Sequence, residues 1–156
     1  MREINAEEVY RLEPCLRVLA EYHNEISVNF KGNYPSRPYR KTLELFAAAL
    51  AAGDSRIAVV ENETEIAGFA KVDLDGKKGK LDYLVVLEEY RGRGYGKMLM
   101  EWAMAAFREN GVAEIEVKVV DRNPAIHLYE AYGFRMNAHI LMKKEEFSNE
   151  NQKNTP

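Results

Sequence analysis

Eight residues decide the fold of this chain: Tyr90-Arg91-Gly92-Arg93-Gly94-Tyr95-Gly96-Lys97. They join an extended run to an amphipathic segment, and their glycines allow the tight turns that bring a backbone close to a ligand. Bare N–H groups then stand at a helix start, where the helix dipole adds partial positive charge. Arg91, Arg93 and Lys97 add formal charge to the same loop. The stretch therefore predicts a strand, a loop that binds a pyrophosphate, and a helix.

The segment after the loop has the pattern of a helix with one apolar face. That face carries Leu99, Trp102, Ala103, Ala106 and Phe107, and Asn110-Gly111 ends the helix. Next, Ile115, Val117 and Val119 alternate with polar residues, which is the period of a half-buried strand. Because a helix usually links parallel neighbours, the crossing through Leu81–Val119 predicts a parallel pair.

Three extended runs precede the loop: Ile57–Glu61, Ile66–Asp73 and Lys80–Leu87. Turn residues at Asn62–Thr64 and Asp75-Gly76 separate them. Strands this close together predict an antiparallel meander.

The N-terminal part reads as a short strand at Arg2–Ile4, a helix over Ala6–Glu25, and a loop with two prolines. A second helix follows over Arg40–Ala52, with Gly53 placed as its left-handed cap.

At the other end, Pro124 opens a helix that runs to Gly133, and Phe134–Lys143 reads as a last strand. The whole order predicts a mixed α/β fold, in which helices on both faces cover a central sheet with an antiparallel meander and one parallel crossing. We expect one domain over residues 1–144 and a polar, disordered tail over 145–156.

Composition limits the function classes. The 156 residues fit one domain, and 46% hydrophobic with 30% charged residues is typical of a globular chain. A net charge of −3 argues against nucleic acid as the main partner. No apolar run approaches the length of a membrane span or a signal peptide. The sequence therefore predicts a cytoplasmic location, with no nucleic-acid or membrane partner, and it is compatible with a homodimer.

Other classes of glycine-rich loop are alternative interpretations of this stretch. A Walker A loop needs a longer glycine spacing and a hydroxyl residue after its lysine, whereas Met98 follows Lys97. A Rossmann loop would follow the first strand of a parallel unit, whereas this one follows a meander. A plain glycine-rich turn also stays open.

The loop resembles the acetyl-CoA loop of the GNAT acetyltransferases, whose form [QR]-x-x-G-x-[GA] is matched by Arg91, Gly94 and Gly96. A second element, Asn123 to Phe134, is similar to the A-x-x-x-Y-x-x-x-G-F helix of that family, with Ala125, Tyr129 and Gly133-Phe134 at the matching positions. Many members carry an asparagine at the position of Arg122, and here Asn123 stands one residue later.

The resemblance implies an N-acetyltransferase that moves an acetyl group from acetyl-CoA to an amine by direct attack, without a covalent enzyme intermediate. Tyr129 would protonate the leaving sulfur, and the Val86 N–H would stabilise the carbonyl oxygen. The implied cofactor-binding residues are Leu84, Val86, Arg91, Gly92, Arg93, Gly94, Tyr95, Gly96, Lys97 and Asn123. A non-catalytic acyl-CoA-binding sensor or interaction domain of the same fold is the alternative.

A general base is harder to select. Asp82 lies two residues from Leu84 in a strand, so we expect it to share a face with Leu84 and Val86 and to look toward the acceptor. Asp73 is a second candidate. His127 flanks the buried stripe of its helix, and Cys15 reads as a small packed hydrophobe. No cluster has metal-ligand spacing, so no metal is expected.

The acceptor is expected to be a primary amine of a small molecule or peptide. The loop Lys31–Tyr39 carries aromatic and polar residues suited to a polar ligand: Asn33, Tyr34, Ser36 and Tyr39. Glu21 and Glu25 end the preceding helix and would attract a cationic amine. A plain connecting loop is an equally open interpretation.

Overall fold

The architecture is given by a computed structural model that describes residues 1–146 of the chain. The chain forms two units, Met1–Pro124 and the segment from Ala125 onward. Of the tail predicted over 145–156, residues 147–156 lie outside the described part, and the boundary at 144 stays a prediction.

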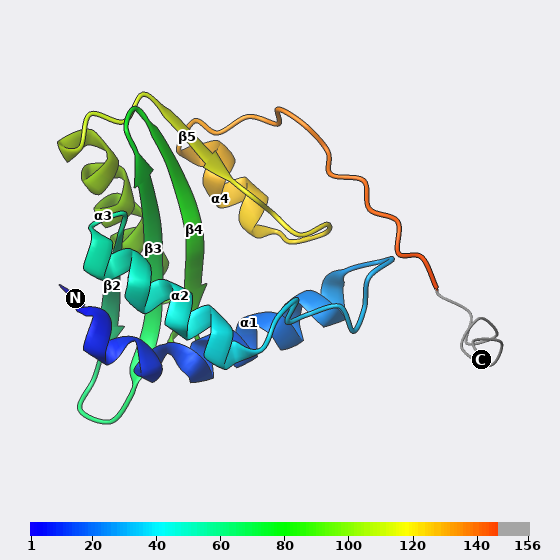
Figure 1. Ribbon diagram of the computed structural model, residues 1–156, viewed down its shortest axis with the longest axis horizontal. Coiled ribbons are helices and arrows are strands. Elements are labelled where there is room, and N and C mark those ends of the chain that lie inside the picture. Colours follow the sequence, from blue (N-terminus) through cyan, green and yellow to red (C-terminus); the bar gives the residue numbers. More distant parts are fainter. Residues whose placement is uncertain (147–156) are drawn as a thin grey trace, which may run out of the picture. The chain divides into compact units, whose positions relative to one another are not determined.

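A mixed sheet with the order β1-β2-β3-β4-β5 forms the centre of the first unit among the described residues (Figure 1). Neighbours from β1 to β4 are antiparallel, and β4 pairs with β5 in parallel. This confirms the predicted meander and the predicted parallel crossing. The strands are β1 (Arg2–Glu3), β2 (Ser55–Glu61), β3 (Ile66–Asp75), β4 (Lys78–Val86) and β5 (Glu114–Val117).

Helical segments connect these strands. They are η1 (Ala6–Leu12), α1 (Glu13–Ile26), α2 (Tyr39–Ala52), η2 (Glu88–Tyr90) and α3 (Tyr95–Glu109). The helix predicted over Ala6–Glu25 is present, but its first part, Ala6–Leu12, is a 3₁₀ helix and the α-helix begins at Glu13. Pro14 explains the break, since proline lacks an N–H group and fits only the first turn of an α-helix.

The sheet of the first unit carries helices on both faces (Figure 1). On one face, Leu12 and Phe46 from η1 and α2 pack against Ile57 and Phe69 of the sheet. On the other face, Leu99 of α3 packs with small sheet residues: Ala58, Ala67 and Ala70. Phe46, Phe69 and Leu99 are almost wholly buried, so packed side chains cover the sheet on both faces.

A β-bulge interrupts the pairing of β3 with β4. Lys71 lies opposite Tyr83 and Val72 lies opposite Leu81, so Asp82 is an extra residue on β4. The parallel ladder between β4 and β5 ends at the pair Leu81 and Val117, one residue before the bulge. The predicted continuation of the last strand of this unit to Val119 is therefore wrong, because its ladder with β4 ends before the bulge.

In the second unit, α4 (Ala125–Ala131) follows Pro124 as predicted. Tyr129 is buried, and its ring meets Phe134 edge to face, with 6.0 Å between ring centroids. The predicted strand over Phe134–Lys143 is wrong, because residues 134–146 form no strand. Leu141 is 93% exposed, so this apolar run lacks the ladder partner that a strand needs.

Candidate active site

The glycine loop connects η2 to α3 in a left-handed backbone conformation. Gly92 has φ 80°, and Gly94 caps α3 with φ 82° and ψ 8°. The first hydrogen bond of α3 runs from the Met98 N–H to the Gly94 carbonyl, 3.0 Å. The N–H groups of Tyr95, Gly96 and Lys97 thus come before the ladder of the helix, and no side chain caps them. This is the arrangement in which a helix start receives an anion.

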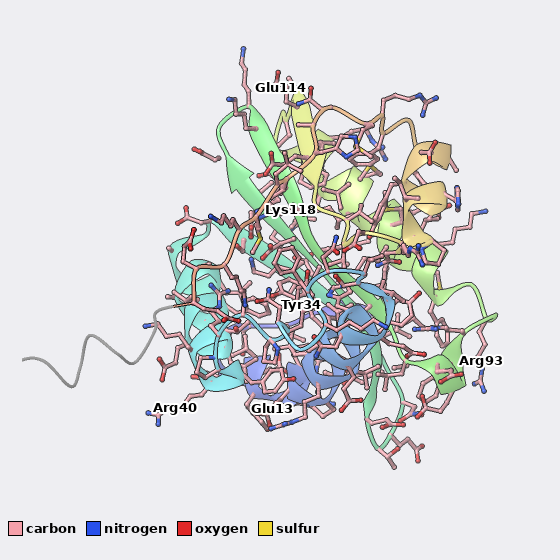
Figure 2. The ribbon with its side chains drawn as sticks, turned by 90° about the vertical axis from the view of Figure 1, so that its right-hand side faces the viewer. Glu13, Tyr34, Arg40, Arg93, Glu114 and Lys118 are labelled. Carbon is pink, nitrogen blue, oxygen red and sulfur yellow. The ribbon has the colours of Figure 1, made fainter. Side chains whose placement is uncertain are left out.

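Cationic side chains surround this helix start. The Arg91 Nε donates to the carbonyl oxygen of Val86 at 3.1 Å, which fixes the loop to the end of β4. Arg93 is exposed on the outside of the loop (Figure 2), with its guanidinium 5.3 Å from the ring centroid of Tyr90. Lys97 is exposed and lies 3.9 Å from Glu101 one turn along α3. Positively charged side chains and N–H groups without an intrahelical acceptor therefore lie together at the start of α3.

The edge of β4 that faces away from β3 leads through η2 to the loop, and within residues 1–146 no strand pairs with it beyond Leu81. The Leu87 N–H donates to the Ala67 carbonyl of β3 at 2.8 Å. Since N–H and C=O groups alternate in direction along a strand, those of Leu84 and Val86 point to the opposite edge. β5 has already left that edge at Leu81. The Arg91 bond brings the Val86 end of this edge next to the loop, and the pairing of Leu84 and Val86 with a ligand stays a prediction.

Asp82 lies on the other face of the sheet. Its carboxylate accepts from the Lys71 ammonium at 2.7 Å, and that ammonium lies 4.9 Å from the Phe46 ring of α2. Leu84 and Val86 instead pack with the cluster on the α3 face. The prediction that Asp82 shares a face with them is wrong, because the bulge at Asp82 shifts the alternation by one residue.

Polar groups extend from Asp82 across three strands. Lys71 donates to Asp73 at 2.5 Å as well as to Asp82, and its side chain is only 5% exposed. The Ser55 hydroxyl donates to Asp73 at 2.6 Å, and Lys80 lies 3.5 Å from Asp82. We call Ser55, Lys71, Asp73 and Asp82 the bulge cluster. Both carboxylates proposed as a base are therefore bound to cations.

A hollow of about 480 Å³ opens beside the bulge cluster on the α2 face. Leu45, Phe46 and Ala49 form its apolar wall, and Arg37 and Lys80 lie among its charged lining residues. Burial raises the pKa of the neighbouring Tyr83 above its ordinary value. The hollow thus combines an apolar wall with charged lining residues.

The segment after β5 is tied to the end of α1. The Asp121 carboxylate accepts from the Ser27 hydroxyl and from the Val28 N–H, both at 2.9 Å. The bond from the Val28 N–H, followed by the Ser27 bond, lowers the pKa of Asp121. Arg122 follows with φ 65°, a left-handed conformation that suits asparagine better than arginine. Asn123 closes the turn through its N–H, which donates to the Val120 carbonyl at 3.0 Å.

Tyr129 lies in the second unit, in the apolar face of α4. Burial raises the pKa of this phenol to about 12, so it keeps its proton at neutral pH. His127 on the same helix is exposed, 3.7 Å from Glu130, which fits a surface histidine.

Two other predictions concern cysteine and metal. Cys15 is 1% exposed, and burial raises the pKa of its thiol to about 12, so it packs as a small hydrophobe as predicted. Within residues 1–146, no group of three or more His, Cys, Asp or Glu side chains could hold a metal ion. No helix in that range has the length and apolar character to cross a bilayer.

The loop predicted to wall the acceptor side folds back on α1. The Asn24 side chain accepts from the N–H groups of Gly32 and Tyr34 and donates to the Tyr34 carbonyl. The Tyr34 ring, labelled in Figure 2, meets His23 edge to face at 5.2 Å. The loop is thus held in place, and Glu21 and Glu25 are exposed on the helix before it.

The sequence reasoning missed Lys71 and Asp121. A signal for Lys71 was present: it is the only charged residue in the otherwise apolar run Ile66–Val72. A lysine there must find a counter-charge, and Asp73 stands on the same strand face. Asp121 gave no comparable signal, because its partners are 93 and 94 residues away in the chain.

Two curated acetyltransferases are similar to this chain in sequence. The chain is similar to streptothricin acetyltransferase of Streptomyces lavendulae, 36% identical over 85 residues, which cover 52% of this chain and 45% of that protein. It is also similar to ribosomal protein bS18-alanine N-acetyltransferase of Haemophilus influenzae, 32% identical over 78 residues, which cover 50% of this chain and 53% of that protein. The chain thus spans about half the length of these curated relatives.

Solved structures agree in fold. The structure of a tetramutant of the BH1408 protein from Bacillus halodurans matches with a TM-score of 0.73 and 22% identity, over 92% of this chain and 98% of that chain. PaiA N-acetyltransferase from Thermoplasma acidophilum, in complex with coenzyme A, matches with a TM-score of 0.69 and 19% identity, over 87% of this chain and 89% of that chain.

The family model for the Acetyltransferase (GNAT) family matches residues 19–134, which include both the glycine loop and α4. The matched segment is more than half of the chain. The chain therefore belongs to the acetyltransferase (GNAT) family.

Proposed function

We propose that the protein is an N-acetyltransferase that moves the acetyl group of acetyl-CoA directly to a primary amine. One observation carries the proposal: Arg91 fixes a left-handed glycine loop, at the start of α3, to the end of a strand with an outward-facing main chain. Backbone donors for a pyrophosphate thus adjoin an edge that can pair with an extended amide chain.

The residues present fit coenzyme A. In the proposal, the N–H groups of Tyr95, Gly96 and Lys97 receive the pyrophosphate, and Arg91 and Arg93 supply counter-charge. The main chain of Leu84 and Val86 pairs with the amides of the pantetheine arm. The structural relative in complex with coenzyme A supports this choice of ligand. Asn123 is proposed to contribute a hydrogen bond to the arm.

Acetyl transfer needs a proton donor for the departing thiolate and a hydrogen-bond donor that stabilises the oxygen of the acetyl carbonyl. We assign the Val86 N–H to the oxygen, because a positioned backbone donor stabilises the charge that develops there. We assign Tyr129 to the thiolate, because its phenol carries a proton and stands at the position of the proton donor in the matched family motif.

The attacking amine must also lose a proton, and that proton needs an acceptor. Asp82 was predicted to take it, but Lys71 and Lys80 bind its carboxylate on the other face of the sheet. In the proposal the amine proton therefore passes to solvent water.

The acceptor is proposed to enter the hollow beside the bulge cluster, with its apolar part on Leu45 and Phe46. The names of the two curated relatives support an amine of a small molecule or of a peptide. Arg37, which lines this hollow, belongs to the same loop as Tyr34. A cytoplasmic location agrees with the buried, unpaired thiol of Cys15.

A panel of primary amines tests the proposal. Purified protein is mixed with acetyl-CoA and one amine at a time, and release of the CoA thiol is followed. Transfer requires thiol release that depends on the amine and on the enzyme concentration. If acetyl-CoA raises the melting temperature but no amine releases thiol, the chain is an acyl-CoA sensor. Stabilisation by ATP-Mg in place of acetyl-CoA would point to a nucleotide enzyme.

A further inference from the structure

Lys71 is a buried cation that the proposed chemistry does not use. Its side chain is 5% exposed, and its ammonium lies between Asp73 of β3 and Asp82 of β4. Burying an ammonium group is costly unless counter-charges hold it with good geometry. The contacts that satisfy Lys71 therefore fix the positions of both carboxylates relative to β3.

The two carboxylates differ in what they are attached to. Asp73 is anchored on the far side by the Ser55 hydroxyl of β2, at 2.6 Å. Asp82 is the extra residue of the bulge, opposite no residue of β3. Lys71 thus ties Asp82, the bulge residue of β4 that has no ladder partner on β3, to the strand β3.

The position of this contact matters for the strand edge. Leu81, directly before Asp82, makes the last pair with β5, and Tyr83, directly after it, resumes the pairing with β3 opposite Lys71. The bulge also decides that Leu84 and Val86 face α3, because a shift by one residue exchanges the two faces of a strand. A feature that holds the bulge therefore sets the direction of the Val86 main chain.

We propose that Lys71 is a positioning residue that clamps the bulged Asp82 to β3 and thereby aims the Leu84 and Val86 main chain at the pantetheine arm. This inference rests on the proposed function for its ligand, but the clamp itself is a property of the protein alone. It assigns Asp82 an anchoring role in place of the base role first expected.

The test compares Lys71→Met with Lys80→Met. Lys80 also lies beside Asp82, at 3.5 Å, but both residues belong to β4, so this ion pair does not join the bulge to β3. Backbone amide chemical shifts of Tyr83 to Val86 are measured without ligand, and CoA affinity is measured by titration, both well below the melting temperature. Thermal unfolding gives the stability of each variant.

Lys71→Met is expected to move the Tyr83 to Val86 amide signals and to raise the dissociation constant of CoA about tenfold, as the loss of one or two hydrogen bonds would. Since a misplacement of about 1 Å can cost about 10²-fold in rate, kcat should fall by that order. Lys80→Met should leave the Leu84 to Val86 signals and the CoA affinity unchanged, and its kcat is not compared because Lys80 lines the proposed acceptor hollow.

The proposal is overturned if Lys71→Met only lowers the melting temperature, with unmoved amides and unchanged CoA affinity, because Lys71 is then merely structural. If Lys71→Met does not fold, Asp82→Ala decides. A clamp predicts weaker CoA binding in Asp82→Ala, whereas unchanged CoA affinity rejects it. If wild type binds no CoA, the proposed function fails, and the ligand-free amide shifts still decide on the clamp.

Discussion

Replacing Gly94 by valine separates backbone strain from ligand binding. Gly94 has φ 82° and ψ 8°, and a Cβ atom built there meets no heavy atom within 4 Å. The cost of Gly94→Val is therefore conformational, about 1–3 kcal/mol for a non-glycine residue held in this region. For a chain of this size the melting temperature should fall by about 2–12 °C.

Gly53 provides a matched control. It caps α2 with φ 77° and ψ 11°, and a Cβ atom there also meets nothing within 4 Å. Gly53→Val should thus lose the same stability as Gly94→Val. At a concentration 100 times its dissociation constant, acetyl-CoA should stabilise Gly53→Val and wild type alike by about 2.7 kcal/mol.

Gly94→Val should lose that stabilisation, because the side chain blocks the approach of a phosphate to the backbone. A 100-fold loss of affinity leaves only about 0.4 kcal/mol at the same ligand concentration. Thermal scans of the three proteins with and without acetyl-CoA measure both quantities. Equal stabilisation of Gly94→Val and Gly53→Val would refute the assignment of the loop.

Three further predictions concern the remaining residues. Tyr129→Phe keeps the ring and removes the proton, so kcat should fall by about 10²-fold with the CoA dissociation constant nearly constant, as steady-state kinetics and titration will measure; unchanged kcat makes Tyr129 structural. The folded pKa of Asp121 lies below its ordinary value of 3.8, so the stability that it adds is present above that value and is lost as the pH falls through the folded pKa. Denaturant unfolding should show Asp121→Asn less stable than wild type at neutral pH and equal to it in acid; a constant difference contradicts this. Arg122→Gly relieves a left-handed arginine with φ 65° and should stabilise the protein by up to about 1 kcal/mol in the same assay, whereas destabilisation would show that the Arg122 side chain contributes more than its backbone costs.

Local signals predicted much of the fold. Gly53 ends α2 in the left-handed conformation expected of a cap, and the helix after the glycine loop ends at Asn110 as predicted. Both features depend on the residue itself and on its neighbours in the chain. The glycine loop belongs to the same class, since its conformation comes from Gly92 and Gly94.

Features that depend on distant residues were not predicted. The face of Asp82 follows from a bulge that Lys71 holds across two strands, and alternation alone places Asp82 on the wrong side. The strand that was expected to reach Val119 ends early, because the end of its ladder is set by β4. Residues 134–143 have an apolar pattern but no ladder partner, which no pattern within the segment could show.

The central claim is that coenzyme A binds the glycine loop and the free edge of β4. Titration of CoA into isotope-labelled protein, followed through backbone amide signals, tests it most directly. Saturable binding is expected, with the largest shift changes at Leu84, at Val86 and from Gly92 to Lys97. Saturable changes confined to Ser55, Asp73 and the other residues of the hollow, or no saturable binding, would contradict it.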